Sequence, residues 1–217
     1  MRKAFISIIL ITLLVCAVAA LAETTDEFHA MGGNVQDAAA YNNLGVMFSK
    51  KGMWDEAITQ YKLALSLQPR MAEAHYNLGT AYDRTGMINE AISSYHNAVA
   101  VEPAYAAAHN KLGTAYFKVG MTNEAIEEFQ KSLAFEPGAT DALSNLGYAY
   151  YYKGMLNDSI ETYAKAIAIN PDLFDVHYYL GKACVKKGSY TSAMKHFYRA
   201  GLLYAKKYFS QKNEALQ

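Results

Sequence analysis

Residues 106–139 have the sequence AAAHNKLGTAYFKVGMTNEAIEEFQKSLAFEPGA, and this 34-residue stretch is one of five similar copies. Its Leu-Gly pair at 112–113 recurs at 44–45, 78–79, 146–147 and 180–181. A second glycine follows seven residues later in each copy, and prolines recur at the same 34-residue step. Because three residue types stay in phase, the chain is a tandem repeat. We divide it into units 38–71, 72–105, 106–139, 140–173 and 174–207.

Each unit has the pattern of two consecutive helices. In the third unit, Leu112 and Tyr116 share a helix face, and Gly120 is placed to end that helix. We expect Asn123 to cap the second helix and Pro137 to end it. Small residues at unit positions 8 and 20 allow the two helices to approach closely. The aromatic residue at position 24 is expected to fill the space beside them: Tyr61, Tyr95, Phe129, Tyr163 and Phe197.

The recurring pattern of Leu-Gly, Tyr, Gly, Ala, Phe or Tyr, Ala and Pro resembles the tetratricopeptide repeat family over residues 38–207. The resemblance implies an all-α, right-handed superhelical solenoid of antiparallel helix pairs, with the first helices lining the concave side. Two departures stand out. Cys184 replaces an aromatic residue of the other units, and the last unit has Ala205 in place of proline. We therefore expect the helix from Thr191 to continue through Tyr204, Tyr208 and Phe209 as a C-terminal capping helix, with 208–217 as its end and tail.

The N-terminus has the pattern of a targeting segment. Arg2 and Lys3 precede an uncharged stretch, 4–22, that ends in Ala-Leu-Ala. This predicts a signal peptide over 1–22. Two alternatives remain open, namely an uncleaved membrane anchor and a lipid-bearing Cys16, for which Val15 departs from the lipobox. All three predict a periplasmic or otherwise extracytoplasmic protein. Residues 23–37 are expected to form a flexible lead-in.

Composition excludes several functional classes. The formal net charge is zero, and removal of 1–22 leaves 18 basic and 20 acidic residues, which argues against nucleic-acid binding. Two cysteines cannot build a disulfide framework. We find no phosphate-binding glycine loop, no nucleophile elbow and no paired metal ligands. The sequence therefore predicts neither an enzyme nor a cofactor.

Three histidines occupy position 4 of their units: His75, His109 and His177. Equivalent positions of stacked helices lie about 10 Å apart, too far for two side chains to share one metal ion easily. The pattern favours packed histidines, and a histidine-dependent metal or haem handler is the alternative.

Polar and aromatic residues mark the face of the first helices opposite the core. An asparagine ladder resembles the one that holds peptide backbone in the O-GlcNAc transferase superhelix, since an amide both donates and accepts hydrogen bonds. Its members are Asn42, Asn43, Asn77, Asn110, Lys111 and Asn145. Tyrosines of the last two units predict an adhesive patch, unless the chain's own termini cover it. These are Tyr148, Tyr151, Tyr152, Tyr178 and Tyr179, flanked by Lys182.

The sequence thus predicts a non-catalytic interaction scaffold or adaptor in the bacterial envelope, with a peptide or partner protein on its concave face. An alternative is an assembly factor for a membrane machine, similar to pilotins or to cytochrome-maturation proteins. Membrane attachment through 4–22 would favour that alternative.

Overall fold

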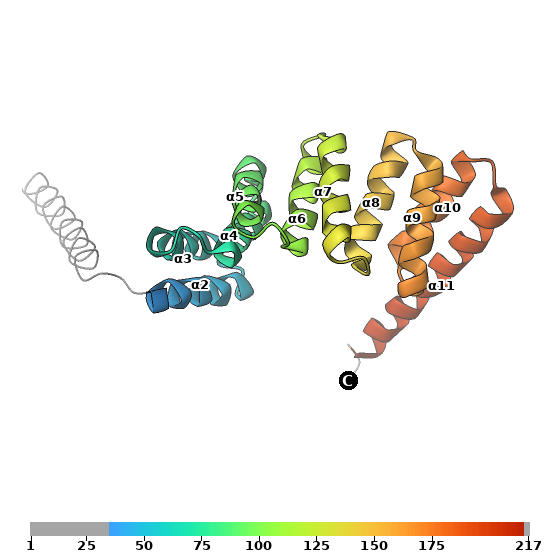
Figure 1. The fold of residues 1–217 in the computed structure, drawn as a ribbon. Coiled ribbons are helices and arrows are strands. Elements are labelled where there is room, and N and C mark those ends of the chain that lie inside the picture. The colour runs from blue at the N-terminus through green and yellow to red at the C-terminus, as the bar shows by residue number, and fades with distance from the viewer. Residues whose placement is uncertain (1–34, 215–217) are drawn as a thin grey trace, which may run out of the picture. The chain divides into compact units, whose positions relative to one another are not determined.

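The computed structural model describes residues 35–214, with side chains placed for 37–208. This part of the chain is all helix and turn, in consecutive helix pairs (Figure 1). The helices are α2 (Val35–Lys50), α3 (Trp54–Leu67), α4 (Ala72–Arg84), α5 (Ile88–Val101), α6 (Ala106–Lys118), α7 (Thr122–Phe135), α8 (Thr140–Lys153), α9 (Leu156–Ile169), α10 (Phe174–Lys186) and α11 (Tyr190–Glu214). The predicted all-α fold of helix pairs is confirmed.

The chain divides into two compact units at Arg70. Unit 1 contains the α2–α3 hairpin, and unit 2 contains the four hairpins from α4 to α11. Within unit 2, each hairpin packs on the next through its second helix, so that α5 contacts α6, α7 contacts α8, and α9 contacts α10.

The Leu-Gly glycine sets the distance between the two helices of each hairpin. A Cβ atom added to Gly147 would lie 2.7 Å from the Tyr163 ring, which is closer than any real contact. The other four units repeat this arrangement with separations of 2.5 to 2.8 Å. The aromatic ring at position 24 therefore occupies space that only glycine leaves open, as the sequence predicts.

The second glycine that recurs every 34 residues ends the first helix of each pair. Gly120 has φ +85°, a left-handed conformation that glycine adopts without strain. The Met121 N–H donates to the Tyr116 carbonyl at 3.0 Å, and the Gly120 N–H donates to the Phe117 carbonyl at 3.1 Å. These two bonds satisfy carbonyls at the helix end, in the manner of a Schellman motif.

The predicted cap at Asn123 is wrong. Helix α7 begins at Thr122, and Met121 is its N-cap residue, with no side-chain capping bond. The tight turn at Gly120 brings Met121 directly into helical register, where its carbonyl accepts from the Ala125 N–H at 3.0 Å. Asn123 consequently lies inside the first turn.

The two chain ends differ in how far the structure describes them. Helix α2 begins at Val35, within the predicted lead-in 23–37, whereas the rest of that segment and the predicted signal segment lie outside the described residues. At the other end, α11 continues to Glu214, which confirms the extended C-terminal helix. Across the described residues, the structure offers no helix with the length and apolar character needed to cross a membrane.

The core of the last two hairpins is apolar and includes a thiol. Tyr163 of α9 packs in one cluster with Val176, Leu180 and Cys184 of α10 and with Ala193 of α11. Cys184 is a buried free cysteine, and burial raises the pKa of its thiol. It fills the position that an aromatic residue takes in the other units.

Candidate functional site

The first helices of unit 2 line a groove of about 1340 Å³. The groove runs across α6, α8 and α10, and the C-terminal part of α11 borders it. Its lining includes Asn110, Lys111, Thr114, Asp141, Ser144, Asn145, Tyr148, Tyr163, Phe174, Asp175, Tyr179, Tyr204, Lys207 and Tyr208. Five of the sequence-predicted binding residues are thereby brought together: Asn110, Lys111, Asn145, Tyr148 and Tyr179.

Two asparagines of neighbouring repeats form the polar floor of the groove. The Asn145 side-chain N–H₂ donates to the Asn110 carbonyl oxygen at 2.9 Å and lies 3.5 Å from the Thr114 hydroxyl. This bond uses half of each amide. The Asn145 oxygen and the Asn110 nitrogen have no partner in the described part of the chain. An unpaired acceptor beside an unpaired donor matches the hydrogen-bonding pattern of a peptide group.

Aromatic rings form one wall of the groove and continue beyond it. The Tyr148 and Tyr179 ring centroids lie 4.7 Å apart, in an edge-to-face arrangement. Phe117 adds a ring 5.3 Å from Tyr148 and 5.6 Å from Tyr152, and Tyr178 lies 5.3 Å from Tyr179. We call Phe117, Tyr148, Tyr152, Tyr178 and Tyr179 the aromatic wall. Tyr152 is its most exposed member, with 69% of its surface accessible.

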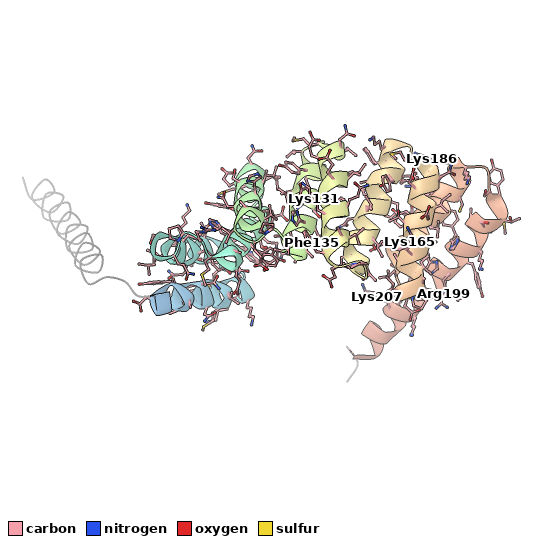
Figure 2. All side chains as sticks on the ribbon, viewed as in Figure 1. Lys131, Phe135, Lys165, Lys186, Arg199 and Lys207 are labelled. Carbon is pink, nitrogen blue, oxygen red and sulfur yellow. The ribbon has the colours of Figure 1, made fainter. Side chains whose placement is uncertain are left out.

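Two lysines of α10 lie over these rings. The Lys182 ammonium is 5.4 Å from the centroid of Tyr179 and 5.5 Å from that of Tyr178. The Lys186 ammonium, labelled in Figure 2, lies 4.2 Å from the centroid of Tyr151. Cation–π contacts hold both lysines against the aromatic surface. Tyr151 itself is buried, so it supports the surface from beneath and does not present its ring to a partner.

Tyr163 lies under this wall with an unsatisfied hydroxyl. It is the one described residue with a buried side-chain polar atom that lacks a hydrogen-bond partner. Burial raises the pKa of Tyr163, and the neighbouring Tyr179 and Tyr148 raise it further. In the second repeat, the equivalent Tyr95 hydroxyl donates to Thr80 at 3.3 Å. The residue in the place of Thr80 is Tyr148 here, so the partner that Tyr95 has is missing.

The C-terminal helix supplies the side of the groove that the sequence analysis missed. The Tyr204 ring packs 5.8 Å from Phe174, and Lys207 and Tyr208 lie one turn further along α11. Figure 2 labels Lys207 on this last part of the helix. The helix borders the groove and leaves its volume open. The signal was present in Ala205, which removes the proline stop, but the sequence could not show where the extra turns would lie.

Other predicted binding residues lie elsewhere. Asn42 is buried in unit 1, so its amide is not presented to a partner. Asn43 is exposed on α2, and Asn77 is half-buried on α4, where it does not line the groove. The ladder of Asn side chains therefore reduces, at the groove, to Asn110 and Asn145.

Two of the position-4 histidines bond to a residue of their own repeat and to the proline that ends the preceding one. His109 Nδ1 lies 2.6 Å from Glu128 Oε2, and His109 Nε2 donates to the Pro103 carbonyl at 2.9 Å. Lys131, which Figure 2 labels on α7, pairs with the same glutamate at 2.6 Å. The described residues contain no group of three or more His, Cys, Asp or Glu side chains placed to hold a metal ion.

The last repeat replaces that glutamate with a second histidine. His177 Nδ1 lies 3.2 Å from His196 Nδ1, and His177 Nε2 donates to the Pro171 carbonyl at 3.1 Å. Burial lowers the pKa of both rings, and each also faces a cation, Arg199 for His177 and Lys195 for His196. The pair is a neutral hydrogen bond between α10 and α11.

Comparison with known proteins gives the same repeat type. One model described as TPR repeat matches residues 47–86, 84–120 and 147–188, and a second described as Tetratricopeptide repeat matches 106–139. No curated protein matches the chain.

Solved structures provide further relatives. The crystal structure of MamA is 32% identical, has a TM-score of 0.71, and is matched over 75% of this chain and 95% of that one. YrrB, titled a TPR protein with an unusual peptide-binding site, is 21% identical with a TM-score of 0.69, over 88% of this chain and 97% of that one. PilF of Pseudomonas aeruginosa is 20% identical with a TM-score of 0.70, over 77% of this chain and 76% of that one. The repeat phase, the hairpins and these matches agree, and the chain belongs to the tetratricopeptide repeat family.

Proposed function

We propose that this protein is a non-catalytic scaffold that binds an extended peptide segment of a partner protein in the groove of unit 2. The observation that carries the proposal is the Asn110–Asn145 pair beside the aromatic wall. The unpaired amide atoms would bond one peptide group of the ligand, and the rings would pack against its side chains. Because the amides recognise main chain, the site selects an extended conformation more than a particular sequence.

The comparisons support binding as the general role. YrrB is titled as having a peptide-binding site, and its repeat fold covers most of this chain. The family match supports an interaction scaffold as well.

We further propose that the scaffold acts in the bacterial envelope. The proposal rests on residues 1–22, whose basic start, apolar stretch and small-residue end have the pattern of an export signal.

A site-specific photocrosslinker tests groove binding. We expect a benzophenone amino acid at Lys111, on the groove, to crosslink one recurring peptide segment in cells. The same amino acid at exposed Ile169, which does not line the groove, should not crosslink that segment. The segment, synthesised with a fluorescent label, should bind the purified protein by anisotropy. The combined change Tyr148→Ala, Tyr152→Ala and Tyr179→Ala should weaken that binding at least tenfold, because hot-spot aromatic residues contribute about 2 kcal/mol or more.

The controls separate binding from folding. The helical circular dichroism signal of the triple variant should match that of the wild type. Equal affinity of the folded triple variant, or equal crosslinking from both positions, would defeat the proposal of a groove ligand.

A further inference from the structure

The two ends of the repeat array carry apolar faces that have no partner in the described chain. Leu44 on α2 is 36% exposed, whereas the leucines at the same position of the last three units are 1–6% exposed. Met47 is 56% exposed, and its equivalents are alanines that are at most 1% exposed. We call Leu44 and Met47 the α2 face.

The outward side of α11 shows the same contrast. Phe197 is 36% exposed, whereas its equivalents Tyr95, Phe129 and Tyr163 are 1–2% exposed. Beside it, Met194 and Tyr198 are 72% and 70% exposed. We call Met194, Phe197 and Tyr198 the α11 face.

Inside unit 2, each of these faces has a defined partner. The second helix of one repeat receives the first helix of the next, as Tyr163 of α9 receives Val176 and Leu180 of α10. The α11 face corresponds to the surface of a second helix that packs on the next repeat. The α2 face corresponds to the surface of a first helix that packs on the preceding repeat. A repeat array normally ends in polar capping surfaces, which keep it soluble. Here both terminal surfaces are apolar.

We propose that the occupant of each face is a second copy of this chain, with the α11 face of one copy packed on the α2 face of the next. The contact would continue the repeat-to-repeat interface already present three times inside unit 2. Such a head-to-tail contact is heterologous, so it extends into an open chain of copies unless it closes into a ring.

Charge favours this pairing over a contact between two α11 faces. Residues 190–208 contain four basic side chains and no acidic one: Lys195, Arg199, Lys206 and Lys207. On α2, Asp37 lies in the first turn and Lys50 in the last. A pair of α11 faces would place like charges together, whereas head-to-tail packing places α11 against a helix that carries both signs of charge.

Light scattering after size-exclusion chromatography tests the proposal on the full chain. The average mass should rise with concentration through successive multiples of the monomer. Met194→Glu and Met47→Glu should each be monomeric, because a carboxylate cannot be buried unpaired in the contact. Exposed Ile169→Glu is the matched control on α9, and it should assemble like the wild type.

Mixing the two variants gives the decisive result. Met194→Glu keeps its α2 face and Met47→Glu keeps its α11 face, so an equal mixture should form dimers and nothing larger. A wild type that stays monomeric at all concentrations would overturn the proposal. So would a mixture that stays monomeric, or an assembly that survives in either variant alone.

Two further variants test whether folding or the groove affects assembly. Tyr198→Glu replaces Met194→Glu if circular dichroism shows that the latter fails to fold. The triple tyrosine variant of the groove should assemble normally, because its substitutions lie on neither terminal face. Loss of assembly in that folded variant would contradict the proposed interface, and loss of peptide binding alone would not.

Discussion

The side chain at repeat position 24 fits only where the residues that face it leave enough space and offer a hydrogen-bond partner. The ring at position 24 needs a glycine opposite it, and its hydroxyl needs a small polar partner. The first requirement is met in all five repeats, and the second fails at Tyr163. The stability of variants with single substitutions tests both requirements.

The Tyr163 hydroxyl should cost the folded state free energy. Tyr163→Phe removes a buried polar group without a partner, so we expect the free energy of unfolding to rise by about 1 kcal/mol. Tyr95→Phe is the matched control, because it removes a hydroxyl bonded to Thr80, and it should lower the free energy of unfolding by about 1 kcal/mol. Urea denaturation followed by circular dichroism measures both. Destabilisation by Tyr163→Phe would mean that its hydroxyl is bonded.

The glycine of the Leu-Gly pair should tolerate no larger residue. Gly147→Ala forces a methyl group against the buried Tyr163 ring, and we expect a loss of about 1–3 kcal/mol. Gly201→Ala in α11 is the matched control, since nothing lies within 4 Å of its added Cβ. That change should stabilise the helix by about 0.5–1 kcal/mol. Thermal unfolding of the two variants should therefore shift in opposite directions, and a shared direction would contradict this account.

Helices and their ends were predictable where the repeat phase fixed them. Gly120 and Pro137 marked helix ends correctly because each acts through its own backbone. The predicted cap at Asn123 was wrong, because the turn at Gly120 starts the helix before a favoured capping residue is reached. The course of α11 beyond Tyr204 was not predictable, since a helical pattern gives length but no direction. The groove border at Lys207 and Tyr208 therefore came only from the structure.

The hairpin of α10 and α11 should be sensitive to acid. The pKa values of His177 and His196 are lowered in the folded state, chiefly by burial, so the unfolded chain binds protons at a higher pH than the folded one does. Stability from the neutral pair is present above the unfolded pKa of about 6.5 and is lost as pH falls below it. Asp172, which faces His177, opposes this shift but does not reverse it.

Thermal unfolding between pH 7.5 and 5 tests this on the variant His196→Gln. The wild type should lose more stability over that range than the variant, because the variant has one fewer histidine to protonate. Hydrogen exchange should place the difference in α10 and α11. Parallel pH profiles for the two proteins would contradict the neutral pair.

At the scale of the whole molecule, the sequence predicted the family and the order of hairpins but not the division at Arg70. The 34-residue phase passes through that point without interruption, since Pro69 stands where the other prolines stand. Periodicity reports which residues are equivalent, and it does not report where the chain divides into compact units. The same limit hid the burial of Asn42, whose sequence position matches exposed or half-buried residues elsewhere.

The targeting segment also belongs to this scale. We expect the mature chain isolated from a bacterial host to begin at Glu23, because Ala20 and Ala22 provide the small residues that signal peptidase requires. N-terminal sequencing of the protein from a periplasmic fraction checks this. Recovery of the intact N-terminus from membranes would support the anchor, and a lipid-modified N-terminus at Cys16 would support the lipoprotein.

Alkylation of Cys184 would follow the opening of the α10–α11 hairpin. Its thiol is closed off inside the α10–α11 hairpin, and only the thiolate reacts quickly with alkylating agents. Each modification event would therefore report one opening of that hairpin. If Cys16 is removed with residues 1–22, Cys184 is the one remaining thiol. The time course of labelling would then report the opening of this hairpin without any engineered probe.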